Sequence, residues 1–239
     1  MIKFFRHIRQ NLVIENKTSK YFKYAIGEII LVVIGILLAL SISNWNDDRI
    51  DAQTEIRALT ELRKSILIDL DRITNKQKEV NKSVEDINYL QTLIENKNYK
   101  YKKELDTLFG VIYGMRILKL NDAFYEYLKS AGLNLIKDEK IRLQIVQLFE
   151  NDYEQLNWIN ELEMSINEVS RAYYLSNFHD LTFAKFATPN DFKFIWTDRF
   201  YHNIIDYRLI TLEVNHIIKY DETINTIKRL VTAINKYLD

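Results

Sequence analysis

The chain has 239 residues, among which five are glycine, one is proline and none is cysteine. The absence of cysteine excludes disulfides, thiolate metal sites and cysteine nucleophiles, and the shortage of glycine and proline disfavours turn-rich β folds. The 33 basic and 33 acidic residues balance overall, but residues 1–23 hold six Lys or Arg against one Glu and the remainder is correspondingly acidic. A basic N-terminal segment of this kind indicates a membrane surface or a nucleic acid.

The basic segment, residues 1–23, has a helical apolar pattern. Ile2, Phe5, Ile8 and Leu12 would share one face of a helix, with the basic side chains elsewhere. This pattern predicts a cytoplasmic amphipathic helix that lies in the membrane interface. A disordered basic leader is the alternative.

Residues 24–44 are predicted to cross a membrane. The core of this segment, YAIGEIILVVIGILLALSI, contains one ionisable residue, and at about 1.5 Å per residue it spans roughly 28 Å. The basic residues before it place the N-terminus in the cytoplasm by the positive-inside rule. The alternatives are a buried core helix, which the lack of a polar face disfavours, and a signal peptide cleaved near Ala39.

Small residues and one acidic residue mark this transmembrane segment. Gly27, Gly35, Ala39 and Ser43 would form a face that a second helix can approach closely, which predicts homo-oligomerisation through the membrane. Glu28 lies about one turn inside the cytoplasmic end, where its carboxylate can reach the interface by snorkelling. A functional intramembrane charge is the alternative for Glu28.

The N-terminal sequence resembles a known family. The blocks MIKFFRHIRQNL and YAIGEIILVVIGILLAL, followed by NWN, are similar to an uncharacterised family of single-pass membrane proteins of Bacteroidota, a domain of unknown function. The resemblance covers residues 1 to about 50. It implies a Gram-negative inner membrane with the C-terminal domain in the periplasm, and it implies no catalytic residue.

Residues 45–239 are predicted to form a periplasmic helical bundle that starts with a long coiled-coil-like helix, about residues 45–96. The second apolar seam of this helix is irregular and includes Asp69, which favours packing within a bundle over an isolated two-stranded coil. The first seam repeats every seven residues, at Trp45, Ala52, Leu59, Ile66, Ile73, Val80, Ile87 and Ile94.

Further helices are predicted from apolar periodicity and capping residues. They cover residues 102–119, a short piece at 121–132, then 138–178 and 198–238, with an irregular stretch at 179–197 around the single proline. The predicted fold class is therefore all-α, an antiparallel bundle behind a transmembrane helix.

Few residues suggest chemistry. Asp198, His202 and Asp206 recur every four residues and are a weak candidate for a metal site, although ordinary charged helix faces show the same spacing. The carboxylates between Glu150 and Glu163 are expected on a solvated face, since no ExxH motif accompanies them. Phosphate-binding, zinc-protease and nucleophile-elbow motifs are absent from the sequence. We therefore expect neither an enzyme nor a cofactor.

An aromatic-rich region surrounds the irregular stretch. Its rings could line a cleft for a small ligand or a partner chain, or they could seal one end of the bundle as core. The residues concerned are Tyr173, Tyr174, Phe178, Phe183, Phe186 and Trp196. Nucleic acid is not an expected partner, because the domain is acidic.

These observations predict a structural or interaction protein rather than a catalyst. Its expected partners are the lipid bilayer, further copies of itself through the transmembrane and long helices, and other envelope proteins. The alternative is a periplasmic ligand-binding sensor module that acts through a partner protein.

Overall fold

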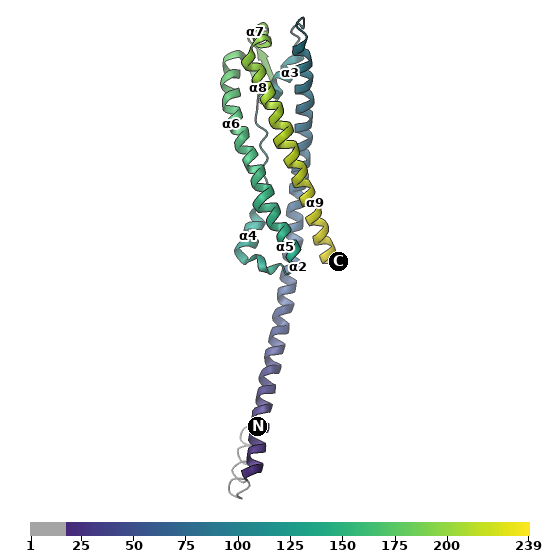
Figure 1. Cartoon of the computed structure of the whole chain (residues 1–239), viewed down its shortest axis with the longest axis vertical. Coiled ribbons are helices and arrows are strands. Elements are labelled where there is room, and N and C mark those ends of the chain that lie inside the picture. Colours follow the sequence, from purple (N-terminus) through teal and green to yellow (C-terminus); the bar gives the residue numbers. More distant parts are fainter. Residues whose placement is uncertain (1–17) are drawn as a thin grey trace. The chain divides into compact units, whose positions relative to one another are not determined.

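The computed structural model describes the backbone of residues 18–239 and the side chains of Lys23 and of residues 26–239 (Figure 1). The chain divides into two compact units, residues 1–55 and 56–239, which are described separately. The interfacial helix predicted within residues 1–23 falls largely outside the described residues.

Helix α2 (Thr18–Glu95) contains the apolar segment. From Ile26 on it is long and apolar enough to cross a membrane, and none of its most apolar window is buried. The large apolar side chains from Ile29 to Leu40 are between 47% and 63% exposed. The first unit therefore holds an apolar helical surface that is exposed within the part of the chain that the structure describes.

The seven-residue repeat of α2 builds the core of the second unit. Leu59, Ile66, Ile73, Val80 and Ile87 are all completely buried. Trp45, at the start of the predicted repeat, is instead 68% exposed. The predicted seam is thus a core seam from Leu59 onward.

Two further long helical rods complete the bundle. The first joins α5 (Glu139–Val146), the π-helix η2 (Gln147–Asp152) and α6 (Tyr153–Asn177), and the second joins α8 (Arg199–Ile210), the π-helix η3 (Thr211–Ile217) and α9 (Ile218–Leu238). Asp138 caps the first rod by accepting a hydrogen bond from the Ile141 N–H, and Asp198 caps the second through Phe200 N–H. The helices predicted at 138–178 and 198–238 are confirmed.

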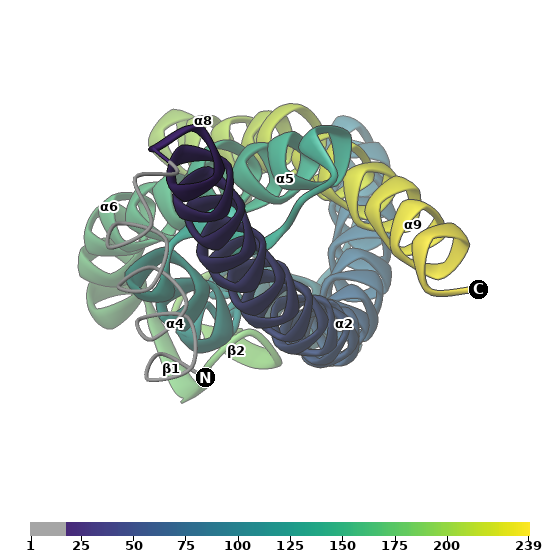
Figure 2. The same cartoon turned by 90° about the horizontal axis from the view of Figure 1, so that it is seen from below.

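The second rod runs antiparallel to α2. As residue numbers rise along α2, the numbers of their hydrogen-bonded partners on α9 and α8 fall. Figures 1 and 2 show the rods beside one another. The hydrogen-bonded pairs are Arg63 with Asn235, Gln77 with Asp221 and Gln91 with Asp206, each at 2.7 Å. An antiparallel helical bundle is therefore the observed architecture, as predicted.

The helix predicted at residues 102–119 is wrong in its second half. Helix α3 (Leu105–Ile112) is followed by the extended C-cap residue Tyr113, and Gly114 adopts a φ of +131°, a conformation that glycine tolerates best. Residues 113–122, called here the internal segment, run without regular secondary structure to α4 (Ala123–Ala131). Side chains from α2, α6 and α8 bind its backbone, which replaces the hydrogen bonds of a helix.

Residues 179–197, expected to be irregular, instead form regular secondary structure. Strands β1 (Phe178–Thr182) and β2 (Phe186–Pro189) form an antiparallel hairpin, followed by the short helix α7 (Phe192–Thr197). Gly110 packs so closely on this hairpin that a Cβ there would overlap the backbone of Phe186. Gly132, with a φ of +98°, ends α4 before the 3₁₀ turn η1 (Leu133–Leu135).

Candidate functional site

Several buried polar residues gather around the internal segment. The Asn160 amide bonds both backbone groups of Leu118, through Leu118 N–H at 2.9 Å and Leu118 C=O at 2.8 Å. The carboxylate of Asp69 accepts the N–H of Asn121 at 3.2 Å. Because unpaired buried backbone groups are costly, these side chains supply what a helix or sheet would otherwise provide.

A buried ionic cluster joins this segment to α6, α8 and η3. Glu163, Arg208 and His216 are each 0% exposed. Glu163 Oε1 accepts a 2.7 Å hydrogen bond from Arg208 Nη1 and lies 3.0 Å from His216 Nε2. Glu163 Oε2 accepts the backbone N–H of Arg116 at 3.0 Å. One carboxylate thus binds two helical elements and the internal segment together.

Arg208 reaches the internal segment as well. Its Nη2 donates to the carbonyl oxygen of Gly114 at 2.9 Å. The carbonyl is accessible because the positive φ of Gly114 turns the backbone away from a helical path. Arg208 therefore bridges the carboxylate of Glu163 and the backbone of the segment.

Arg116 adds a second buried guanidinium. Its Nη2 donates to the carbonyl of Val111 at 2.5 Å, and its Nε lies 3.3 Å from Ser83 Oγ on α2. Burial, and then the nearby charge of Arg208, lowers the pKa of Arg116 to about 10. Two guanidiniums therefore share the charge of one buried carboxylate.

The carboxylate of Glu163 is strongly held in its charged form. Burial alone would raise its pKa, but the contact with His216, the charge of Arg208 and the backbone N–H of Arg116 together lower the pKa to about 2. Since the members of the cluster are sealed from solvent, their arrangement locks the internal segment in place and offers no open site for a substrate.

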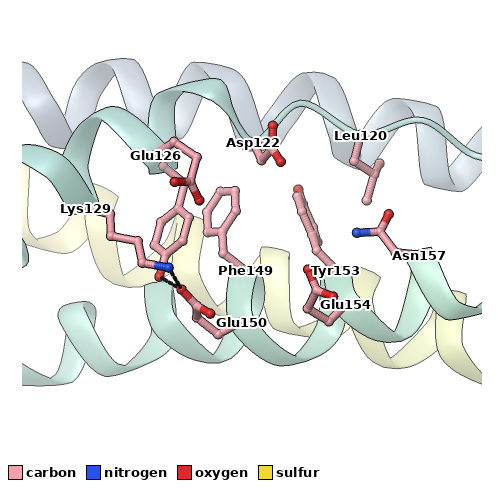
Figure 3. A pocket seen from close by; sticks show the side chains of 10 residues that line it. Leu120, Asp122, Glu126, Lys129, Phe149, Glu150, Tyr153, Glu154 and Asn157 are labelled. Atoms are coloured by element: carbon pink, nitrogen blue, oxygen red, sulfur yellow. Dashed lines mark hydrogen bonds and ion pairs between the residues drawn. The ribbon is translucent and has the colours of Figure 1, made fainter.

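A small pocket of about 160 Å³ lies between α4 and the η2–α6 region (Figure 3). Lys129 Nζ and Tyr125 Oη both bond Glu150 Oε1, at 2.7 and 2.6 Å, and the hydrogen bonds from Lys129 and Tyr125 lower the pKa of Glu150. The Tyr125 ring stacks on Phe149 with centroids 4.4 Å apart. These contacts hold α4 against η2, and the pocket lies where the two elements meet.

A larger cleft of about 710 Å³ lies beside the β1–β2 hairpin. Its wall includes Asp106, a buried carboxylate that accepts hydrogen bonds from Tyr101 Oη at 2.9 Å and Thr188 Oγ1 at 2.8 Å. Burial, and then the bond to Asp106, raises the pKa of Tyr101 to about 12. Asp180, with a φ of +49°, also lines the cleft. The cleft is polar and large enough for a small ligand.

The aromatic residues predicted as a cleft divide between core and surface. Tyr174 is completely buried, and its hydroxyl bonds the carbonyl of Phe109 at 2.7 Å. Phe186 lines the 710 Å³ cleft, and Phe183, which is 42% exposed, packs edge-on against Tyr113. The other three, Tyr173, Phe178 and Trp196, are buried core residues. Most of the cluster therefore seals the end of the bundle.

The three residues of the weak metal candidate have separate partners. Asp198 caps α8 and accepts a short hydrogen bond from Tyr173 Oη, His202 Nε2 lies 3.0 Å from the carbonyl of Trp196, and Asp206 accepts from Gln91. His202 and Asp206 line a common cleft of about 230 Å³. Within residues 26–239, no group of His, Asp and Glu side chains is arranged to hold a metal ion.

The predicted membrane-helix face lies open within its unit. Gly27, Gly35, Ala39 and Ser43 are exposed, and a Cβ added at either glycine would meet no atom within 4 Å. Glu28 is partly exposed on the same helix.

The sequence did not single out the buried cluster, and the solvated face expected for the carboxylates between Glu150 and Glu163 is wrong in part. Glu163 is completely buried and Asp152 is 9% exposed, whereas Glu150 and Glu154 are exposed. One signal was available. Glu163 stands between Ile159 and Ile166 on the buried stripe of α6, where a charge requires a partner.

Comparison with known proteins gives the chain a family. A model described as a family of unknown function, DUF6090, matches residues 28–213. The chain belongs to the DUF6090 family. The match extends far beyond residues 1–50, on which the sequence resemblance rested, and it includes Arg116, Glu163 and Arg208, while His216 lies beyond it. No curated protein and no solved structure matches this DUF6090 member.

Proposed function

We propose that this protein is a single-pass, membrane-anchored interaction protein, which presents its helical bundle to the periplasm as a homo-oligomeric scaffold or envelope-complex subunit. The observation that carries the proposal is the uncovered apolar helix from Ile29 to Leu40, whose large side chains are 47% to 63% exposed. An apolar surface on all sides of a helix is stable in lipid, because the helix satisfies its own backbone there.

The direction of insertion follows from charge. Residues 1–23 carry six basic residues and one glutamate, which favours their retention in the cytoplasm. The resemblance to single-pass proteins of Bacteroidota supports a Gram-negative inner membrane. We test the topology with a reporter fused after Asp239. Activity of alkaline phosphatase supports a periplasmic domain, whereas fluorescence of a cytoplasm-only reporter would overturn the proposal.

Self-association through the anchor is supported by its open small-residue face. Gly35 leaves room for a second helix to approach closely, and Ala39 is a small exposed residue one turn further on. The variant Gly35→Ile/Ala39→Ile should lower the mass of the detergent-extracted particle, whereas Leu37→Ile, on the opposite face, should not. An unchanged mass in both would remove this contact from the proposal.

A second candidate is the periplasmic sensor module that acts through a partner protein. The polar cleft of about 710 Å³ beside the hairpin supports it. Thermal-shift screening of the full-length protein tests this function. Reproducible stabilisation by a small molecule, abolished by Thr188→Val in the cleft wall, would favour the sensor over the scaffold.

A further inference from the structure

The bundle has an apolar groove between α6 and α8. It measures about 470 Å³ and is lined by Ser165, Ile166, Val169, Ser170, Phe200, Asn203, Ile204 and Tyr207. None of these residues is charged, although Asp, Glu, Lys and Arg make up 28% of the chain. Depletion of charge together with exposed aromatic rings is the composition of interface centres rather than of ordinary surface.

The two walls of the groove differ in size. The α8 wall carries the rings of Phe200 and Tyr207, which are 51% and 54% exposed. The α6 wall carries the small, exposed side chain of Ser165 beside Val169, which is 53% exposed, while Ser170 is buried. A ring from a second molecule can therefore pack over Ser165, while the groove's own Tyr207 ring packs over Ser165 of that molecule.

The register between the two helices makes this exchange symmetric. Glu163 bonds Arg208, and the rings of Tyr173 and Phe200 lie 5.7 Å apart, so α6 and α8 run antiparallel. Counting residues along both helices from these two pairs places Tyr207 at nearly the same level along the helix axis as Ser165. A two-fold axis along the helices preserves height, and it would bring Tyr207 of one copy to Ser165 of the other.

The exposed apolar surface extends beyond the groove but remains modest in area. Ile210 and Val214 continue it along α8 and η3, at 55% and 52% exposure. With about half of each aromatic or aliphatic side chain exposed, the surface amounts to roughly 500 Å², below the roughly 800 Å² per partner of a standard interface.

This area favours a second copy of the chain as the occupant. Such a surface is too small to capture a soluble partner tightly. Two copies anchored in one membrane are confined to the same layer and inserted the same way up, which raises their effective concentration. We propose that the α6–α8 groove is a self-association surface, in which two membrane-anchored copies pack about a two-fold axis with Tyr207 against Ser165 of the other copy. The inference rests on the homo-oligomer of the proposed function and names its contact within the bundle.

Disulfide trapping in membranes tests the contact. The chain has no cysteine, so differently tagged Ser165→Cys and Tyr207→Cys chains can be co-expressed at full length and oxidised. We expect a disulfide between the two tagged forms. The matched control replaces Ser165→Cys with Arg171→Cys, an exposed α6 position outside the groove, and should give no such product. An equal yield from both pairs would overturn the proposal.

A charge placed in the groove tests the ring contact a second time, without oxidation. Tyr207→Lys in the full-length protein should raise the dissociation constant of the dimer in nanodiscs at least about tenfold. Tyr89→Lys is the control, because Tyr89 is 56% exposed on α2 and outside the groove. Both side chains are solvent-exposed, so unchanged thermal unfolding verifies the fold of each variant.

The outcomes separate this inference from the proposed function. A dimeric wild type that Tyr207→Lys leaves dimeric would overturn the groove contact while self-association stands. A monomeric wild type in nanodiscs would contradict both. Trapping of Ser165→Cys to a different protein would show another occupant and overturn the assignment to a second copy.

Discussion

The side-chain amide of Asn160 pairs with the backbone of Leu118 through both of its polar atoms, at 2.9 and 2.8 Å. This pairing reproduces with one side chain what a neighbouring strand would offer to an extended residue. It shows why an irregular segment can run along the inside of a helical bundle, since each buried backbone group needs a partner.

Asn160→Ala should destabilise the fold by about 3 kcal/mol, because it leaves both backbone groups of Leu118 without partners at roughly 1–3 kcal/mol each. Asn157→Ala, an exposed position on the same helix, is the matched control and should cost well under 1 kcal/mol. Denaturant unfolding of the full-length protein in detergent measures both. Equal small losses would show that the Leu118 bonds do not support the fold.

Glu163→Gln should be more damaging, by about 3–5 kcal/mol, because it leaves Arg208 and Arg116 buried without a countercharge. Glu161→Gln, two residues earlier and exposed, should be nearly neutral. The double variant Glu163→Gln/Arg208→Gln should lose less stability than the sum of the two single variants, since both act on one ion pair. Strict additivity in the unfolding free energies would contradict the coupling.

The stability should also depend on pH through Glu163. Burial alone would raise the pKa of this group, but His216 and Arg208 hold it at about 2, below the ordinary 4.5. A lowered carboxyl pKa contributes stability that is fully present above pH 4.5 and is lost as the pH falls toward 2. The difference between these two pKa values corresponds to roughly 3 kcal/mol of unfolding free energy.

Urea unfolding at pH 5, 4 and 3 measures this dependence. The gap in unfolding free energy between wild type and Glu163→Gln should narrow as the pH falls. Asp69 acts in the opposite direction, because burial raises its pKa above 3.8 and its charged form is held less readily. Curves for wild type and Glu163→Gln that stay parallel from pH 5 to 3 would rule out Glu163 as the titrating group.

Much of the fold could be predicted from the sequence, because its long helices carry a clear apolar period. The repeat through Leu59, Ile66 and Ile87 marks core residues, and Asp138 and Asp198 mark helix starts that the structure confirms. These signals are local, and local signals are what sequence patterns report.

The internal segment could not be recovered in the same way. Residues 116–120 alternate buried and exposed, with Arg116 and Leu118 inward and Ile117 and Lys119 outward, which is the period of an extended chain. The run is too short to outweigh the helical pattern before it. The partners that hold it, Glu163 on α6 and Arg208 on α8, are distant in sequence, so their meeting depends on the tertiary structure.

Gly110 and Gly132 are needed for different reasons, the first because a side chain has no room and the second because of its backbone conformation. Gly110→Ala should cost about 3 kcal/mol or more, because the new Cβ overlaps the backbone of Lys185 and Phe186 in the hairpin. Gly132→Ala should cost about 1–2 kcal/mol, since the site is open and only its φ of +98° resists a side chain. Thermal unfolding ranks the two variants, and the reverse order would refute the close packing of α3 on β2.

The mass of the full-length protein, transferred from its native membrane into lipid nanodiscs without detergent, tests the central claim of a self-associating membrane-anchored bundle. We expect a particle with two copies of the chain, which Tyr207→Lys converts to single copies. A wild-type particle that holds one copy at every protein-to-lipid ratio would contradict it.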